Sequence, residues 1–149
     1  MVDAERLIKL PKVLFLPLPA FDKAENHNFL QTRADLYDLS GALVPNLQYH
    51  YMFKIVGRNC NVNFSLHLIN ATERRIFQLE IYDRHYPSHR GDNGIVWFGP
   101  HMFHKGQARK VTTKLTCAES ERERWFKRFC RHTHITVREL PGQYQRELL

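Results

Sequence analysis

Cysteine is scarce in this chain: the 149 residues include three, namely Cys60, Cys117 and Cys130. They are odd in number, lie far apart and form no Cys-x-x-Cys pair. Disulfide frameworks and cysteine-built zinc sites normally show paired, regularly spaced cysteines, so the sequence predicts neither. We expect buried, reduced thiols, with Cys130 filling a small apolar position in a helix.

Long apolar runs and phosphate-binding glycine loops are missing as well. The most apolar N-terminal stretch, residues 13–21, is interrupted by Pro17 and Pro19, which makes it too short and too broken for a membrane span. No signal-peptide pattern precedes it. The motifs GxGxxG and GxxxxGK[ST] do not occur, so nucleotide-dependent chemistry has no support and no cofactor is expected. These absences predict a soluble, cytoplasmic protein without a membrane partner.

The composition that remains is that of a globular protein, with 43% hydrophobic and 25% charged residues. At this length residues 1–149 are expected to form a single domain. The formal net charge is +7, and the excess lies in residues 74–75, 105–114 and 122–131. Such a surface favours a polyanionic partner, RNA or single-stranded DNA, although a basic protein without a nucleic-acid role fits the charge equally well.

Period-two alternation of apolar residues is the clearest structural signal. Residues 62–68 and 76–82 both alternate, with a turn at residues 70–73 between them. They predict an antiparallel hairpin with these side chains buried: Phe64, Leu66, Phe77, Leu79 and Ile81. His67 then falls on the polar face of its strand, where solvent or a polar network can receive it.

The sequence patterns that indicate the other strands and helices are weaker. Further strands are expected at residues 51–55, 95–98, 111–115 and 133–139. Residues 36–39 could close an earlier strand, but Asp22 could instead cap a helix that carries Phe29, Leu30, Arg33 and Leu36.

A C-terminal helix follows Thr116, which is a plausible N-cap. Acidic residues at its start and basic residues at its end suit the helix dipole. Trp125 and Phe129 are four residues apart and would pack together on the sheet. The predicted fold class is therefore α+β, a mostly antiparallel sheet with one packed C-terminal helix.

Residues 83–104 hold the densest group of chemically active side chains. Four of the nine histidines lie here, surrounded by turn-forming glycines and prolines: His85, His89, His101 and His104. Histidine serves as general acid, general base or metal ligand near neutral pH. The cluster is therefore predicted to lie on loops that form a site, the alternative being a solvated turn.

Metal-free phosphodiester chemistry is the interpretation we adopt for this cluster. His89 and His101 would be the acid/base pair, Arg90 would clamp the phosphate, and Asp83 or Asp92 would orient an imidazole. The same histidines with an aspartate could instead bind a metal ion. Pro87 excludes a regular helix between His85 and His89, however, so no metal is expected.

The function predicted from these residues is that of a nucleic-acid-associated phosphodiesterase or ribonuclease. Its contacts with nucleic acid are assigned to basic residues beside the cluster and on the helix: Lys105, Arg109, Lys110 and Arg128. The alternative is a non-catalytic interaction module that binds or blocks a protein partner.

The order of motifs resembles a family of small, functionally uncharacterised bacterial proteins found on mobile elements. The features shared with it are the segment Leu16-Pro17-Leu18-Pro19, a hydrophobic hairpin, His89-Arg90-x-x-x-Gly94, Gly99-Pro100-His101-x-x-His104 and an aromatic helix. The family tends toward His-x-His after Gly-Pro, whereas Met102 and Phe103 separate the two histidines here. The resemblance implies that the histidine loops are the shared site, and it implies no particular activity.

Overall fold

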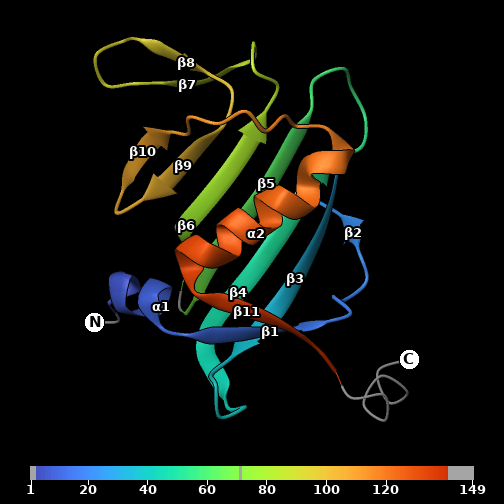
Figure 1. Ribbon diagram of the computed structural model, residues 1–149, viewed down its shortest axis with the longest axis vertical. Helices are drawn as coiled ribbons and strands as arrows, with labels where there is room; N and C mark the ends of the chain where they lie inside the picture. The colour runs from blue at the N-terminus through green and yellow to red at the C-terminus, as the bar shows by residue number, and fades with distance from the viewer. Residues whose placement is uncertain (1–2, 71, 141–149) are drawn as a thin grey trace.

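A nine-stranded sheet dominates the computed structural model, which describes residues 3–70 and 72–140. Its strands are β1 (Lys12–Leu16), β2 (Asp22–Lys23), β3 (Phe29–Tyr37), β4 (Leu43–Lys54), β5 (Asn61–Ile69), β6 (Glu73–Tyr82), β9 (His101–His104), β10 (Gln107–Lys110) and β11 (Ile135–Glu139). Their order is β10-β9-β6-β5-β4-β3-β1-β11, with β2 beside β3 (Figure 1). The neighbours pair antiparallel, except that β1 and β11 run parallel. A separate ribbon is formed by β7 (Pro87–Arg90) and β8 (Val96–Phe98).

The helices are α1 (Ala4–Lys9), the 3-10 turn η1 (Glu119–Glu121) and α2 (Arg122–Thr133). Figure 1 shows α2 lying across one face of the sheet. Its residues Trp125 and Phe129 are completely buried. The Phe129 ring lies 5.7–5.8 Å from the rings of Tyr49, Phe64 and Phe77, on three neighbouring strands. These aromatic contacts fix the helix over the centre of the sheet and form the main core.

The predicted α+β class is wrong, because the protein is mostly β. Strands account for 49% of the described residues and helices for 15%. Four strands of three or four residues, β7 to β10, lie between residues 87 and 110. Segments this short contain too few alternations to stand out from loops, so the sequence understated the strand content.

The predicted central hairpin is confirmed. Strands β5 and β6 pair antiparallel, with Phe64 opposite Leu79 and Leu66 opposite Phe77. These four side chains and Ile81 are at most 2% exposed. Alternation over two long segments therefore gave both the pairing and the buried face correctly.

One open alternative is excluded and two local predictions fail. The alternative helix after Asp22 does not form, because Asp22 and Lys23 form β2 and pair with β3. The strand expected at residues 111–115 is absent from the described structure, and the edge strand β10 ends at Lys110. Thr116 caps no helix, since α2 begins six residues later, after η1, and the Thr116 hydroxyl oxygen accepts from the Ala118 amide at 3.3 Å.

The expectation of reduced thiols is also wrong for two of the three cysteines. Cys60 and Cys117 form a disulfide across a sequence separation of 57, whereas Cys130 is free and buried. Cys60 precedes β5 and Cys117 precedes η1, so the spacing in the sequence gave no hint of their proximity. Disulfides are typical of oxidising compartments, and the cytoplasmic location therefore stays a prediction.

None of the described helices has both the length and the apolar character needed to cross a bilayer.

Reduction of the disulfide is predicted to destabilise the fold. A cross-link closing a loop of 57 residues is worth about 4 kcal/mol in the chain-entropy estimate. We expect dithiothreitol or the Cys60→Ser substitution to lower the melting temperature followed by circular dichroism. Dithiothreitol should have no further effect on the Cys60→Ser/Cys117→Ser variant, which is the control. Three titratable thiols in the unreduced, denatured protein would contradict the assignment.

Candidate functional site

The sheet face opposite α2 is polar and hollowed. Gln78 and Glu80 alternate with core residues of β6, so they point away from the helix. Two cavities of about 530 and 400 Å³ lie on this face and share three lining residues: Arg75, Gln78 and Phe103. We call the larger one, which includes His89 and His101, the His101 pocket. The smaller one, which includes His50 and His67, is the His67 pocket.

A β-bulge determines which side chains of β6 reach this face. The register shifts beside Ile76, so that His67 lies opposite Arg75. Ile76 is the additional residue, and it joins the hydrophobic core. The bulge thereby reverses the alternation of the strand, and Glu73 and Arg75 lie on the same face as Gln78.

The β7–β8 ribbon places His89 beside the edge of the sheet. His89 is opposite Trp97 in the ribbon, with ring centroids 4.9 Å apart. The Gly91 amide donates to the Ile95 carbonyl at 2.8 Å, which closes the turn of the ribbon. The Ser88 hydroxyl donates to the carbonyl of Gly99 at 2.5 Å and ties the ribbon to the segment that enters β9.

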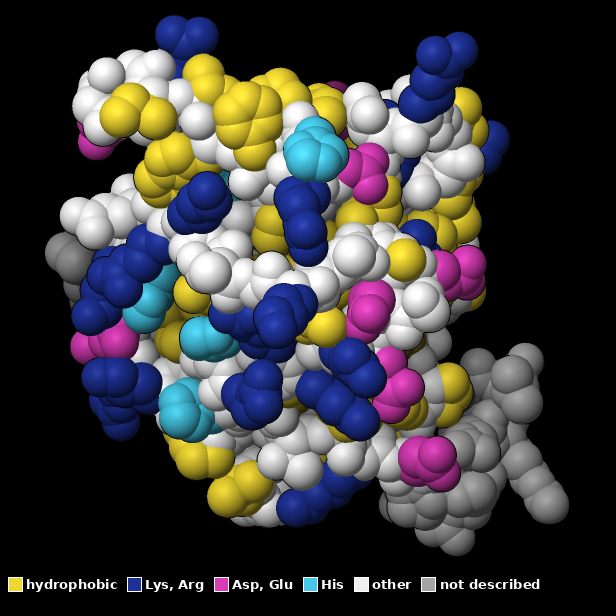
Figure 2. Space-filling view, turned by 45° about the horizontal axis from the view of Figure 1, so that its top comes forward, with side chains coloured by type: hydrophobic (Ala, Val, Ile, Leu, Met, Phe, Trp, Pro, Cys, Tyr) yellow, Lys and Arg dark blue, Asp and Glu magenta, His cyan; other side chains and the backbone are white. Residues whose placement is uncertain are grey.

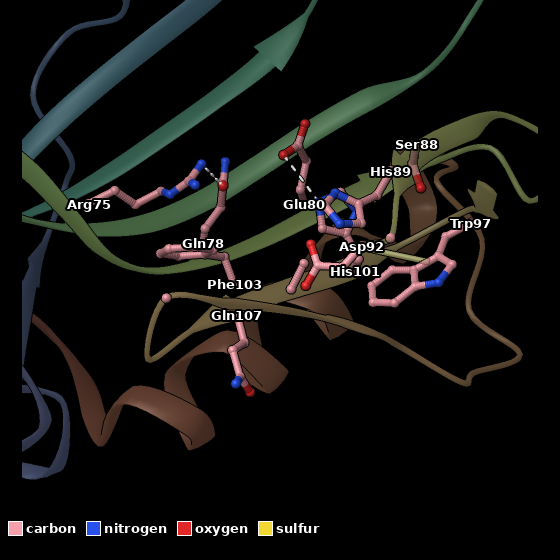
Figure 3. Close-up of a pocket in the computed structure, with 13 residues that line it drawn as sticks. Arg75, Gln78, Glu80, Ser88, His89, Asp92, Trp97, His101, Phe103 and Gln107 are labelled. Atoms are coloured by element: carbon pink, nitrogen blue, oxygen red, sulfur yellow. Dashed lines mark hydrogen bonds and ion pairs between the residues drawn. The ribbon is translucent and has the colours of Figure 1, made fainter. Parts of the chain in front are cut away.

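His101 and His89 converge in the His101 pocket (Figure 3). Their ring centroids are 5.5 Å apart, and His101 is buried whereas His89 is partly exposed. Burial lowers the pKa of His101 to about 4, helped by the neighbouring charges of His89 and Arg75. The imidazole of His101 is therefore neutral at neutral pH, and its Nδ1 has no hydrogen-bond partner among the described residues.

Glu80 faces His101 across the pair of strands β6 and β9. Its Oε2 lies 3.8 Å from Nε2 of His101, and its Oε1 accepts a hydrogen bond from the Tyr82 hydroxyl. Burial raises the pKa of Glu80, against the opposite effects of Arg75 and Asn61. With His101 neutral, the contact joins a carboxylate to a neutral ring and becomes an ion pair only when the ring takes up a proton.

Arg75 supplies positive charge where the two cavities meet. Its guanidinium lies 4.2 Å from the centroid of the Phe103 ring and donates to Oε1 of Gln78 (Figure 3). Two contacts on different strands hold the side chain in one orientation. A preorganised guanidinium beside neutral imidazoles is suited to an anionic ligand such as a phosphate.

The residues predicted as the catalytic group are only partly brought together. His89 and His101 share the pocket, and Asp92 lines it from the turn of the ribbon. Arg90 lies exposed at the end of β7, outside the lining residues, and Asp83 accepts a hydrogen bond from the Cys60 amide at 2.9 Å. Among the charged groups that do line the pocket, Arg75 occupies the position expected of a phosphate clamp.

The two other histidines of the cluster point elsewhere. His85 is exposed and lines a separate cavity together with Asp83. His104 lies on the helix side of the sheet, where its Nε2 is 2.9 Å from Oε2 of Glu5. Four histidines close in sequence therefore lie at three different places.

The predicted nucleic-acid contacts do not form one surface. Lys105 lies in the turn between β9 and β10, with Arg109 and Lys110 in β10. Arg128 lies on α2, over the ring of Trp125 at 5.8 Å, on the opposite side of the sheet from the His101 pocket. None of the four lines the His101 pocket. Lys105 lines a cavity beside α1, with its Nζ 3.8 Å from Oε1 of Glu5, and Lys110 lines the cavity that includes His85.

Sequence reasoning missed Arg75, Glu80 and the pair His50 and His67. Glu80 sits between two core residues, a position that is normally only a solvated face. Arg75 reaches the His101 pocket because of the β-bulge at Ile76, which no feature of the sequence predicts. His50 and His67 come from different strands, and only the register of β4 with β5 brings them together.

No model of a known protein family, no curated protein and no solved structure matches this chain. The resemblance to mobile-element proteins therefore stays a prediction, and any function has to be argued from the geometry of the site.

The buried histidines are predicted to make folding stability sensitive to acid. Burial lowers the pKa of His50 to about 3 and of His101 to about 4, from an ordinary value of 6.5. Below pH 6.5 these histidines bind protons in the unfolded chain but stay neutral in the folded protein. The free energy of unfolding therefore falls as the pH drops from 6.5 toward 4. Urea unfolding at several pH values measures this slope.

Variants show which histidine causes the dependence of the unfolding free energy on pH. His101→Asn should make it shallower, because one of the groups with a lowered pKa is removed. His85→Asn, at an exposed position, is the matched control and should leave it unchanged. Stability that is constant from neutral pH to about pH 4.5 would contradict the burial of neutral imidazoles.

Proposed function

We propose that this protein cleaves phosphodiester bonds in single-stranded RNA by metal-free acid–base catalysis in the His101 pocket. The observation that carries the proposal is the convergence of His89 and His101, with ring centroids 5.5 Å apart, in a pocket that Arg75 also lines. Hydrogen bonds of about 2.7–3.0 Å on each side would let both imidazoles reach a single phosphate group.

The neutral state of His101 at neutral pH suits the role of general base. Being neutral, it can take the proton of a ribose 2′-hydroxyl as that oxygen attacks phosphorus. His89 would then give a proton to the departing 5′-oxygen, which leaves a 2′,3′-cyclic phosphate and a 5′-hydroxyl. One proton is taken up and one is released, and a second step with water would restore both histidines.

Two charged side chains support this sequence of events. Arg75 can stabilise the negative charge that develops on the non-bridging phosphate oxygens. Glu80, 3.8 Å from Nε2 of His101, can stabilise the imidazolium that forms when His101 takes up its proton. The raised pKa of Glu80 reflects its burial, which also strengthens its interaction with a positive charge once His101 is protonated.

The substrate class follows from the nucleophile and from the shape of the pocket. Cleavage without a metal ion uses the 2′-hydroxyl, which DNA lacks. The rings of Phe103 and Trp97 line the pocket and offer surfaces on which unpaired bases can stack. The adjoining His67 pocket extends the groove along the sheet, in the manner of a channel for a single strand.

Removal of either histidine is predicted to abolish cleavage without unfolding the protein. We expect His89→Ala and His101→Ala to lower kcat/KM on a single-stranded RNA by about 100-fold or more, the usual contribution of a general acid or base. A fluorescent oligonucleotide assay in the presence of EDTA measures it. The control is His85→Ala, an exposed histidine outside the pocket. Full activity in both pocket variants, or activity abolished by EDTA, would reject the proposal.

The pH profile tests the role of His101 separately. The general base must be unprotonated, so kcat/KM should fall as the pH drops through about 4, the pKa of His101. Initial rates measured over short times, with folding monitored by fluorescence, separate this loss from acid unfolding. An acid limb near 6.5, the ordinary histidine pKa, would assign the base to another residue.

A second candidate is a non-catalytic interaction module. The segment Arg122–Thr133 contains five Lys or Arg residues and one Glu. Figure 2 shows Lys and Arg side chains gathered over the middle of the face on which α2 lies. An acidic protein partner fits this surface, and wild-type protein devoid of ribonuclease activity would favour the second function.

A further inference from the structure

The His67 pocket contains a group of three potential metal ligands from three adjacent strands. These are His50 on β4, His67 on β5 and Glu73 at the start of β6. Oε1 of Glu73 lies 3.7 Å from Nε2 of His50 and 3.1 Å from Nδ1 of His67, and all the ligand atoms lie within 4.8 Å of one another. The two imidazole rings are stacked, with centroids 3.8 Å apart.

The imidazole nitrogens that face Glu73 have little support from protein atoms. Nε2 of His50 is buried and has no hydrogen-bond partner in residues 3–70 and 72–140. Nδ1 of His67 is also buried and lies 3.1 Å from Oε1 of Glu73, an oxygen that Nε2 of His50 approaches as well. Leaving a buried polar atom unpaired destabilises the folded state. The opposite nitrogen of His67, Nε2, lies 2.9 Å from the Ser65 hydroxyl oxygen. That contact fixes the ring and leaves Nδ1 as the nitrogen available to a ligand.

The two distances from Glu73 agree with a small coordination sphere. Bonds of about 2.1 Å from imidazole nitrogen or carboxylate oxygen to a tetrahedral metal ion separate neighbouring ligand atoms by about 3.4 Å. The distances of 3.1 and 3.7 Å from Glu73 lie on either side of this value. The two imidazole nitrogens lie within 4.8 Å of each other, and small rotations of Glu73 and His50 would bring the set into place.

We propose that His50, His67 and Glu73 bind one divalent transition-metal ion, with Zn²⁺ as the representative case. His50 would bind through Nε2, His67 through Nδ1 and Glu73 through its carboxylate. Two histidines and one carboxylate leave a fourth position for water or for an anionic ligand. This site is separate from the acid–base pair of the proposed ribonuclease, and neither proposal depends on the other.

A simple ion pair does not account for the cluster equally well. Arg33 also approaches Glu73, with Nη1 3.8 Å from Oε1, but its side chain is 48% exposed. Exposed pairs of this kind contribute little stability, and this one leaves Nε2 of His50 without a hydrogen-bond partner among the described residues. The positive charges of Arg33 and Arg75 oppose a bare cation, but they would stabilise an anion at its fourth coordination position.

Binding of Zn²⁺ alone to untagged protein tests the proposal. Isothermal titration calorimetry should give one Zn²⁺ per chain. Glu73→Gln is the first variant, because Glu73 is 40% exposed and its replacement disturbs no packing. We expect it to weaken binding at least ~10-fold, and His67→Ala to weaken it further, since each removes a ligand. His27→Ala, an exposed histidine outside the pocket, is the matched control.

Two further measurements identify the ligands directly. Co²⁺ in place of Zn²⁺ should give the visible absorption of a tetrahedral site, and this absorption should be lost in His50→Ala. Ser65→Ala should weaken Zn²⁺ binding by about 10-fold, because it removes the group that orients His67. Melting temperatures show which variants are folded. If the histidine variants are unfolded, the Zn²⁺ affinity of Glu73→Gln alone tests the proposed site.

The outcomes that would overturn the site are specific. Zn²⁺ affinity unchanged in folded Glu73→Gln, or lowered as much in His27→Ala, would place the metal elsewhere. Absence of Zn²⁺ binding by the wild-type protein at micromolar concentration would also reject it. RNA cleavage in EDTA bears only on the His101 pocket, so failure of one proposal is distinguishable from failure of the other.

Discussion

The packing of α2 on a single face of the sheet is the constraint on which the rest of the structure depends. Trp125 and Phe129 are fully buried there against the aromatic residues of three strands. Within the part of the chain that the structure describes, no helix covers the opposite face, and many of its side chains are polar even where neighbouring strands bury them. Polar residues at most 8% exposed on that face include Asn63, Ser65, Gln78 and His101.

Burial of polar groups without a hydrophobic layer above them has a chemical consequence. Each buried donor or acceptor needs a partner, or it destabilises the fold. Three imidazole nitrogens among the described residues lack one, and they belong to His50, His67 and His101. All three residues line the two cavities of the polar face. A buried polar group without a protein partner calls for water, an ion or a catalytic role to explain it.

The bulge at Ile76 links the core to both cavities. Because Ile76 turns into the core, the strand before it is shifted by one position relative to the strand after it. Glu73 and Arg75 therefore join the polar face. Without the bulge these two side chains would point toward the helix side, and neither the carboxylate beside His67 nor the guanidinium beside His101 would be in place.

The parts of this structure that could be predicted from sequence are those that depend on local periodicity. The alternation around Phe64 and Phe77 gave the central hairpin, and the spacing of Trp125 and Phe129 gave the packed helix. The pair His89 and His101 was found because turn residues concentrated histidines in one segment. Those features are encoded within a few residues of one another.

What could not be predicted depends on register between distant segments. The proximity of Cys60 to Cys117 and that of His50 to His67 arise only when the strands are paired. The position of Arg75 depends on a β-bulge that no residue type in the sequence predicts. Short strands such as β9 carry too few residues for alternation to identify them. The sequence therefore underestimated the extent of the sheet, and the predicted fold class was wrong.

Arg75 connects the two cavities electrostatically as well as spatially. Gln78 and Phe103 hold its guanidinium, and all three residues line both the His101 pocket and the His67 pocket. An anion bound in either cavity therefore interacts with the same positive charge. A metal ion at His50 and His67 would add positive charge to that region and would attract a phosphate to the shared boundary. The polar face would then act as one electrostatic surface with two chemically different ends, the proposed acid–base pair and the proposed metal ligands.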